Sequence, residues 1–417
     1  MTQVTDSEYE FLEDSTPKRR GWLKAIVWVL IALLSGTVAT VAGGYFYITG
    51  QLSASGIEVY STDGSSFDLP TPADINGPIN MLVIGSDTRV DQGSTSYGPV
   101  GSALADVIIL VHISQDRKNA VAMSIPRDLM VSVPECPDPK GGEAFPAKDF
   151  TQINATMTKG GPACTLLAVQ ELTGVAIPYL AMIDFKGVIA MSQAIGGVDV
   201  CVANTIDDSY TDLYLEAGDH TLIGDEALAF LRTRHGVGDG SDLSRISNQQ
   251  VFLTSLMRKL KDEGALANPF KMFQLGTAAL SNMTLSNSLT DLGVIYGLAR
   301  QVNNVDLDKI TFIQLPVYDL EGEYAGRVAA SPERAQELFD LIKSDQPLVL
   351  AEANPGTGAV IAEDSATATP TATPSPSQTP TSTTNPDGTG QPVDGTASTD
   401  LPDWVKGTNA ATTSCSN

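Results

Sequence analysis

The stretch INMLVIG at residues 79–85, followed by DVIILVHI at residues 106–113, decides the class of fold. Both segments are continuous apolar runs, which is the pattern of strands that are buried on both faces of a sheet. A third segment, NAVAMSIPRD at residues 119–128, has the same character and ends as a strand at Pro126. Strands of this kind need helices on both faces, so we expect an α/β domain.

Helix-like segments alternate with these strands along the chain. PACTLLAVQELTG at residues 162–174 predicts a helix because it has proline in its first turn and glycine at its end. We expect further strands at IPYLAMIDF and KITFIQLPV (residues 309–317), and further helices at KGVIAMSQAIGG and at residues 224–231, 243–263, 287–303 and 332–343. The alternation predicts one α/β domain over residues 79–350.

The N-terminal region predicts a membrane anchor. Residues 25–48 contain no charged residue and are long enough to span a bilayer as a helix. A basic cluster, KRRGWLK, precedes this run, so the positive-inside rule places residues 1–24 in the cytoplasm and everything after about residue 49 outside. The alternative is a signal peptide that is cleaved. Residues 49–78 then form an extracytoplasmic stalk.

The charge of the chain excludes one class of partner. Its 417 residues include 49 acidic and 25 basic residues, which gives a net charge of −24. Non-specific binding to nucleic acid requires a basic surface, so we expect no nucleic-acid partner. A local anion site built from a few arginines remains compatible with this composition.

The C-terminal residues 351–417 differ in composition from the rest. They are rich in threonine, serine and proline, and they contain one basic residue, Lys406. Such a segment cannot bury enough apolar area to offset the entropy of the chain. We therefore expect a disordered tail that acts as a solvated spacer.

Four cysteines fit an oxidising exterior. Cys164 lies in a predicted helix and Cys201 ends a predicted strand, and we expect these two to pair. Cys415 falls in the tail that we expect to be disordered, which leaves Cys136 without a stable partner. The alternative is a set of unrelated thiols.

A loop at residues 230–250, FLRTRHGVGDGSDLSRISNQQ, concentrates arginines in this acidic protein. Arg232 and Arg234 share a side if the segment that carries them is extended. Three residues lie on one face of the helix that follows: Asp242, Arg245 and Gln249. The planar fork of arginine matches phosphate oxygens, so the loop predicts a pyrophosphate site. The alternative is a network of ion pairs within the loop.

Charged residues also stand at the ends of the predicted strands. Asp87 and Arg89 follow the first strand, Asp106 begins the second, and Arg127 follows the third. Ligands of α/β sheets usually bind at strand ends. Two aspartates together with phosphate oxygens make a shell of oxygen ligands that suits Mg²⁺ or Mn²⁺. These residues predict phosphate chemistry assisted by a metal, although each aspartate alone is typical of a cap or turn.

At these residues the sequence closely resembles the LytR-CpsA-Psr family of cell-envelope proteins. The matching segments include MLVIGSDTR, ADVIILVHIS, SIPRDLMVSVP, QINATMTKGG and AFLRTRHGVGDGSDLSRISNQQ, in this order, within about residues 79–263. The resemblance implies an α/β/α catalytic domain with a central mixed sheet and a long apolar pocket for a lipid chain. It also implies an Mg²⁺-dependent phosphotransferase. Such an enzyme moves a glycopolymer from a polyprenyl-pyrophosphate carrier to a hydroxyl of peptidoglycan or of a surface protein, and forms a phosphodiester.

The resemblance also implies roles for individual residues. Asp87 and Asp106 match the aspartates that bind the metal, and Arg127 matches the arginine of a P-R-D motif that contacts the pyrophosphate. The implied catalytic residues are Arg127, Arg232, Arg234 and Asp242. The implied pyrophosphate ligands are Arg89, Arg127, Arg232, Arg234, Arg245 and Gln249. Either Asp87 or Asp242 is expected to accept the proton of the acceptor hydroxyl.

Two positions depart from the family pattern, and both departures remove positive charge. Gln152 stands where the family commonly has lysine, and Leu104 stands where many members have arginine. Lys148 or Lys159 is a candidate to replace the missing lysine.

Two other functions would use the same residues. A pyrophosphatase would replace the glycan acceptor with water. A non-catalytic module that binds lipid-linked intermediates would need the arginines but not both aspartates.

Overall fold

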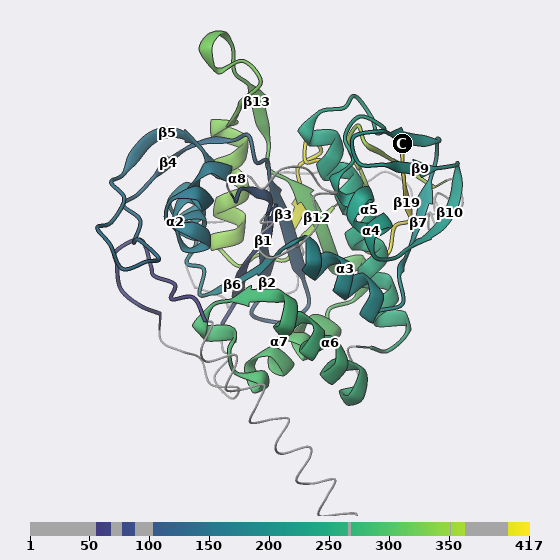
Figure 1. Ribbon diagram of the computed structural model, residues 1–417, viewed down its shortest axis with the longest axis horizontal. Helices are drawn as coiled ribbons and strands as arrows, with labels where there is room; N and C mark the ends of the chain where they lie inside the picture. Colours follow the sequence, from purple (N-terminus) through teal and green to yellow (C-terminus); the bar gives the residue numbers. More distant parts are fainter. Residues whose placement is uncertain (1–55, 68–76, 88–102, 266–267, 351, 363–398) are drawn as a thin grey trace, which may run out of the picture. The chain divides into compact units, whose positions relative to one another are not determined.

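The apolar runs of the sequence form the middle of a seven-stranded mixed sheet (Figure 1). Its strand order is β11 (Met283–Leu285), β6 (Tyr179–Ile183), β1 (Ile79–Ser86), β2 (Ala105–Ile113), β3 (Ala120–Ile125), β12 (Ile310–Gln314) and β18 (Gly407–Asn409). β2 is antiparallel to both β1 and β3, whereas β6 is parallel to β1 and β12 is parallel to β3. The expected α/β domain with a central mixed sheet is confirmed.

The computed structural model describes residues 56–67, 77–87, 103–265, 268–350, 352–362 and 399–417. The predicted cytoplasmic segment, the predicted anchor at 25–48 and Arg89 lie outside these ranges. Among the helices within them, none combines the length and the apolar character that crossing a membrane requires.

The helices that sequence predicts are present, with one addition. They are α2 (Gly161–Thr173), α3 (Phe185–Ala194), α4 (Asp225–Arg232), α5 (Asp242–Asp262), α7 (Leu292–Asn304) and α8 (Pro332–Lys343). α2 ends at Gly174, whose φ of 65° is the left-handed conformation that glycine adopts at helix ends. α7 begins later than predicted because residues 287–289 form a short 3₁₀ turn, η2 (Asn287–Leu289). α6 (Pro269–Asn282) was not predicted.

The two faces of the central sheet serve different purposes. Leu82 of β1 and Ile108 of β2 face a core that includes residues of α2 and α8. At the alternate positions, Val83 and Val107 line an apolar cavity together with residues of α3, α4, α5 and α6. Figure 1 shows α2 and α8 on one side of the sheet, with α3, α4 and α5 on the other. Side chains of a strand alternate between faces, which explains why these strands are apolar throughout.

A second, four-stranded sheet uses residues from the C-terminal region. Its order is β10 (Gly218–Leu222), β7 (Val198–Val202), β19 (Ser414–Ser416) and β16 (Ala359–Ile361). β18 pairs with β12 at the edge of the central sheet, and β17 (Thr399–Leu401) pairs with β15 (Leu348–Leu350). The prediction that residues 351–417 are disordered is therefore wrong for 352–362 and 399–417. The prediction failed because the average composition of residues 351–417 gives no signal for the short strands at either end of this region, which pair with strands formed by distant residues.

The disulfides also correct the sequence prediction. Cys136 is bonded to Cys164 and Cys201 is bonded to Cys415, so the expected Cys164–Cys201 pair is wrong. Cys201 and Cys415 are direct partners in the register of β7 and β19. The error follows from the assumption that the tail has no structure, because that assumption removed Cys415 from consideration.

Short elements connect these layers. The remaining strand pairs are β4 (Met130–Val133) with β5 (Lys148–Gln152), β8 (Ile206–Asp208) with β9 (Leu213–Leu215), and β13 (Val317–Asp319) with β14 (Val328–Ala330). The remaining 3₁₀ turns are η1 (Ile153–Thr158), η3 (Leu307–Lys309) and η4 (Gly322–Tyr324).

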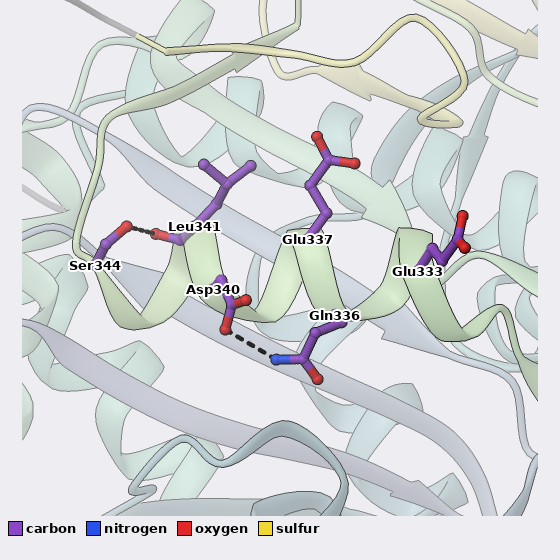
Figure 2. A pocket seen from close by; sticks show the side chains of 6 residues that line it. All are labelled: Glu333, Gln336, Glu337, Asp340, Leu341 and Ser344. Atoms are coloured by element: carbon purple, nitrogen blue, oxygen red, sulfur yellow. Dashed lines mark hydrogen bonds between the residues drawn. The ribbon is translucent and has the colours of Figure 1, made fainter.

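α8 is amphipathic, and its inner face packs on the sheet. Leu338 and Phe339 are buried in the core, whereas the opposite face carries Glu333, Gln336 and Glu337 (Figure 2). This face forms a shallow acidic hollow on the surface. The period of the apolar side chains explains why α8 lies flat on the sheet.

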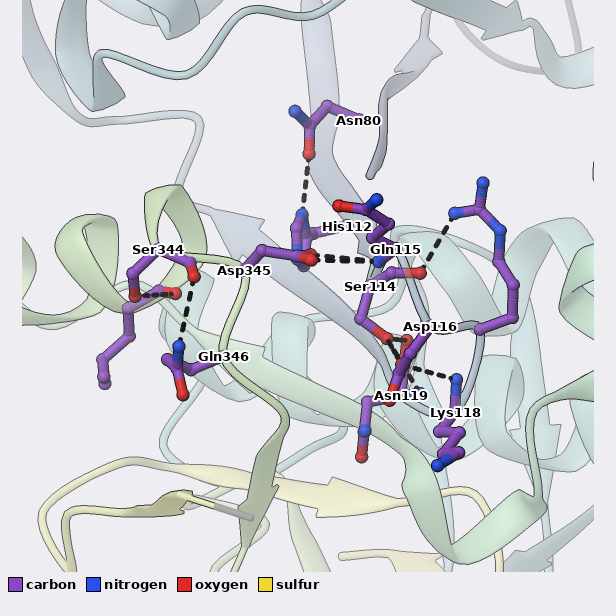
Figure 3. A network of polar contacts seen from close by, with 12 residues as sticks. Asn80, His112, Ser114, Gln115, Asp116, Lys118, Asn119, Ser344, Asp345 and Gln346 are labelled. Carbon is purple, nitrogen blue, oxygen red and sulfur yellow. Dashed lines mark hydrogen bonds and ion pairs between the residues drawn. The ribbon is translucent and has the colours of Figure 1, made fainter. Parts of the chain in front are cut away.

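A polar network joins the end of α8 to the turn between β2 and β3 (Figure 3). His112 is buried, and its ring contacts Asn80 at 2.8 Å and Asp345 at 3.2 Å. Burial lowers the pKa of His112, although the neighbouring Asp345 opposes that shift. The network fixes the end of β2 that lies farthest from Asp106.

Candidate active site

Asp106 is placed at the cleft by a β-bulge. Gly85 pairs with Val107 and Ser86 pairs with Ala105, so Asp106 is the extra residue between two regular pairs. A bulge redirects a side chain at the end of a strand. The Oδ1 atom of Asp106 accepts a hydrogen bond of 2.5 Å from Nη1 of Arg127, which follows β3. The strand ends therefore meet as the sequence predicted.

The first turn of α5 adds a second ion pair. Ser241 caps this helix with its side chain. Nη2 of Arg245 lies 2.5 Å from Oδ1 of Asp242 and 3.0 Å from the main-chain oxygen of Asp106. Nε of Arg127 lies 3.5 Å from the same carboxylate oxygen of Asp242. The two arginines and two aspartates thus form one alternating network that joins β2, β3 and α5.

Asp208 holds the main chain that carries the R-x-R pair. Its side chain is 0% exposed. Oδ2 accepts hydrogen bonds from Oγ1 of Thr233 at 2.6 Å, from N of Arg234 at 3.0 Å and from N of His235 at 3.2 Å, while Oδ1 accepts from N of Tyr210 at 3.0 Å. Burial alone would raise the pKa of Asp208, but these hydrogen bonds lower it below its ordinary value. Sequence reasoning missed Asp208, because three of its four hydrogen-bond donors lie 25 to 27 residues further along the chain.

The predicted arginines line one cleft of about 180 Å³, hereafter the charged cleft. Its lining residues are Asp106, Arg127, Asp208, Tyr210, Thr211, Arg232, Arg234, His235 and Arg245. Four arginines line this space, and their positive charge is offset in part by Asp106 and Asp208, which also line it, and by Asp242 beside Arg245. The arrangement suits a compact, doubly charged anion such as a pyrophosphate.

An apolar cavity of about 450 Å³, hereafter the apolar cavity, adjoins the charged cleft. Asp106, Arg232 and Arg245 line both spaces. The remainder of the apolar cavity is bounded by the sheet face that carries Val83 and by side chains of α3 to α6. The apolar pocket that the family resemblance implied is therefore present in the domain.

Gln249 and its neighbour Asn248 anchor the end of α4. Nε2 of Gln249 donates to the main-chain oxygen of Leu231 at 2.9 Å, and Nδ2 of Asn248 donates to that of Phe230 at 2.7 Å. The last carbonyls of a helix lack partners within the helix, so these bonds fix where α4 ends. Gln249 lines the apolar cavity, and its expected contact with a pyrophosphate stays a prediction.

Arg232 projects from the last turn of α4. Its guanidinium lies 4.6 Å from the centre of the Phe185 ring, in a cation–π contact. The contact orients Arg232 at the junction of the two spaces, because Phe185 also lines the apolar cavity.

Asp87 and Asp106 are the residues that could hold a cation. Asp87 follows β1, and its Oδ1 accepts a hydrogen bond of 2.7 Å from N of Leu104, just before β2. Within the described ranges no group of three or more His, Cys, Asp or Glu side chains is arranged to hold a metal. Mg²⁺ is usually held by one or two carboxylates together with substrate phosphates. Asp106 lines the charged cleft but Asp87 does not, so a cation held by both aspartates together with a phosphate substrate stays a prediction.

One departure from the family pattern, Gln152, lies in a group of charged residues. Nε2 of Gln152 donates to Oδ1 of Asp128 at 2.6 Å, and Nη1 of Arg327 lies 3.3 Å from the same atom. Burial and the charge of Asp242 raise the pKa of Asp128, whereas its arginine neighbours lower it. Lys148 and Lys159, the candidate replacements for the missing lysine, do not line the charged cleft. The sequence did not predict that Arg327 lies beside Asp128.

Comparison with known proteins places these features in a family. The model of the LytR_cpsA_psr family matches residues 44–340. Cell wall biosynthesis protein LcpA of Corynebacterium glutamicum is 29% identical over 323 residues, which are 72% of this chain and 60% of LcpA. The chain thus spans less than two thirds of that relative.

Two further comparisons agree. The polyisoprenyl-teichoic acid–peptidoglycan teichoic acid transferase TagT of Bacillus subtilis is 26% identical over 272 residues, 64% of this chain and 76% of TagT. The crystal structure of B. subtilis TagV has a TM-score of 0.51 and 22% identity, and the match covers 65% of this chain and 97% of TagV. The latter likeness supports the fold. Because the family model covers well over half of the 417 residues, the chain belongs to the LytR-CpsA-Psr family.

Proposed function

We propose that this protein is a phosphotransferase of cell wall assembly. It would move a glycopolymer from a polyprenyl-pyrophosphate carrier to a hydroxyl of peptidoglycan, or of a glycosylated surface protein. The observation that carries the proposal is the junction of the two spaces, where Asp106, Arg232 and Arg245 line both the charged cleft and the apolar cavity. A polyprenyl pyrophosphate has the matching parts, a pyrophosphate bonded to a long apolar chain. The names of LcpA and TagT point to the same process.

The reaction is an in-line attack by the acceptor hydroxyl on the phosphorus nearer the sugar. A new oxygen–phosphorus bond forms, and the bond to polyprenyl phosphate breaks, so polyprenyl phosphate leaves with its electron pair. Either Asp87 or Asp242 accepts the hydroxyl proton. The pyrophosphate linkage itself drives the transfer, and no nucleotide is required.

The arginines stabilise the charge that develops on the phosphates. Arg127 is held by Asp106 and Arg245 by Asp242, so both guanidinium groups are oriented before the substrate arrives. Fixed charges in a site with little water stabilise a transition state more strongly than mobile ones do. Mg²⁺ or Mn²⁺ on Asp87 and Asp106 would neutralise further phosphate charge.

The proposed setting is the outer side of the cell membrane, with residues 25–48 as a single anchor. One observation supports this setting, and the proposed donor is consistent with it. All four cysteines are in disulfides, which persist in oxidising compartments. In addition, a substrate with a polyprenyl chain is itself confined to the membrane.

A product assay tests the proposed reaction. The full chain in detergent is incubated with Mg²⁺, a polyprenyl-pyrophosphoryl glycan and an uncrosslinked peptidoglycan oligomer, and the products are analysed by mass spectrometry. We expect a glycan joined to peptidoglycan through one phosphate, absent with Arg127→Ala and reduced by a chelator. Release of glycan phosphate without conjugate would instead identify a pyrophosphatase. Intact donor that co-purifies with the protein would identify a binding module.

A further inference from the structure

The two spaces give a bound lipid-linked pyrophosphate a direction. The apolar cavity meets the charged cleft at Asp106, Arg232 and Arg245. Tyr210 and His235 line the charged cleft but not the apolar cavity. If the lipid lies in the apolar cavity and the pyrophosphate lies among the arginines, the group on the second phosphate continues into the part of the charged cleft away from the apolar cavity. Tyr210 and His235 line this part together with Thr211.

Tyr210 and His235 form an exposed aromatic stack at this position. Their ring centres are 4.1 Å apart with an angle of 26° between the planes. Tyr210 is 77% exposed, and the side chain of His235 is 57% exposed. One face of the phenol ring is covered by the imidazole, so the other face is open to a ligand.

Main-chain hydrogen bonds to Asp208 fix the position of the stack. The main-chain N–H groups of Tyr210 and His235 both donate to the carboxylate of Asp208, at 3.0 Å and 3.2 Å. The same carboxylate accepts from N of Arg234, which lines the charged cleft. One buried group therefore sets the position of the aromatic stack relative to an arginine of the cleft.

A saccharide ring is the ligand that suits such a surface. One face of a pyranose presents several C–H groups, and these carry partial positive charge that is attracted to the negative face of an aromatic ring. A rigid, exposed aromatic side chain beside a cleft also supplies contact area with little loss of side-chain entropy.

We propose that Tyr210, supported by His235, forms a subsite for the first sugar of the donor, the one bonded to the pyrophosphate. The inference rests on the proposed function and extends it, because it assigns a residue that selects the donor by its sugar. Tyr210 would act by contact with that sugar and not by charge.

Binding of two matched probes tests the subsite. The probes are farnesyl pyrophosphate and farnesyl-pyrophosphoryl N-acetylglucosamine. They share the lipid and both phosphates, and they differ in the sugar and in the additional negative charge of the free terminal phosphate. Binding of each probe is compared between wild type and variant of the full chain by calorimetry. We expect Tyr210→Ala to weaken binding of the sugar-bearing probe by about three- to tenfold and to leave farnesyl pyrophosphate within about twofold. Tyr210→Phe should retain most of the affinity, because it keeps the ring.

Tyr214→Ala is the matched control. Tyr214 is 61% exposed on the neighbouring strand β9 and does not line the charged cleft, so its removal should change neither affinity. Unchanged binding of farnesyl pyrophosphate also shows that the variant is folded.

Other outcomes would overturn the proposal. An equal loss for both probes with Tyr210→Ala would mean that Tyr210 shapes the pyrophosphate site. An unchanged affinity for both probes with a raised KM for the peptidoglycan oligomer would assign the surface to the acceptor. If the wild-type protein bound neither probe, the proposed function would fail, and the subsite with it.

Discussion

Single carboxylates control how much positive charge the cleft offers to a substrate. Burial alone would lower the pKa of Arg127, but the carboxylates of Asp106, Asp242 and Asp128 raise it above its ordinary value. Arg127 therefore stays charged in the folded protein. Asp106 occupies Nη1 of this guanidinium, and the remaining N–H groups of Arg127 are available to phosphate oxygens.

The first prediction concerns Arg127. Arg127→Ala should lower kcat for glycan transfer by about 100-fold or more, because loss of one preorganised donor in a site with little water has an effect of that size. Arg327→Ala is the control, since Arg327 also lies near Asp128 but is 41% exposed and does not line the charged cleft. Equal losses in steady-state assays of the two variants would contradict this ranking.

A second prediction concerns Asp208. All its described partners donate hydrogen bonds to it, so Asp208→Asn places an amide N–H group against other donors. We expect a loss of about 2 kcal/mol in the free energy of unfolding at pH 7, measured with urea. Asp207→Asn, on the exposed neighbour in β8, should change little.

The same pair of variants tests the pH dependence. A carboxyl whose pKa is lowered by folding stabilises the protein above its ordinary pKa of 3.8, and that contribution disappears as the pH falls through the lower folded value. The difference between wild type and Asp208→Asn should therefore shrink below about pH 4. A difference that stays constant with pH would show that the carboxylate charge is not the cause.

At the level of secondary-structure elements, the sequence predicts helices that have local start signals, but it does not predict the pairing of short strands with residues far away in the sequence. α2 and α5 were predicted because the residues that start each helix lie within a few positions of one another. In α5, for example, the side chain of Ser241 caps the first turn. α6 was missed, and Gly276 in its middle weakens the helical pattern. β18 and β19 were missed because they are too short to show periodicity and pair with strands formed by much earlier residues.

The same contrast between local motifs and distant contacts applies to the residues of the candidate site. Arg127, Arg232, Arg234 and Arg245 do meet in one cleft, because a motif carries each of them and strand ends gather at one edge of the sheet. Asp208 and Tyr210 could not be found in this way. Their roles depend on a main-chain turn that only the folded structure brings beside them.

The two disulfides provide a prediction at this scale. Cys201 and Cys415 are 214 residues apart, whereas Cys136 and Cys164 are 28 apart. In the chain-entropy model, the longer closed loop restrains the unfolded state by about 2 kcal/mol more. Replacing Cys201 and Cys415 with alanine should therefore lower the free energy of unfolding by about 2 kcal/mol more than replacing Cys136 and Cys164. Equal losses in urea titrations without reductant would show that local packing decides instead.

For the molecule as a whole, the apolar cavity is a part of the interior that side chains leave unfilled. Its wall of sheet residues continues the pattern of the core on the opposite face, yet α6 and its neighbours do not close over it. Space of this kind in a folded protein is usually a binding site. A larger side chain that fills the apolar cavity should therefore weaken lipid binding without lowering the stability of the fold.

Gly276 allows that separation to be tested. It lines the apolar cavity, and a Cβ atom added there would meet no heavy atom within 4 Å. Gly276→Leu should leave the melting temperature unchanged or raise it, since leucine favours helix over glycine by about 0.8 kcal/mol. It should weaken binding of a long polyprenyl pyrophosphate about tenfold but not that of inorganic pyrophosphate. Gly276→Ala serves as the small control, and undiminished lipid affinity of the leucine variant would place the chain elsewhere.

The strands contributed by residues 399–417 also set a condition on biosynthesis. They follow the other strands in the sequence, yet β18 completes one sheet and β19 lies inside the second. A chain interrupted before residue 399 would expose the hydrogen-bonding edge of β12 and leave β7 without one neighbour, and Cys201 would carry a free thiol. Exposed strand edges promote aggregation and incompletely folded chains are substrates of proteases, so we expect a chain that lacks residues 399–417 to accumulate to a lower level than the full chain.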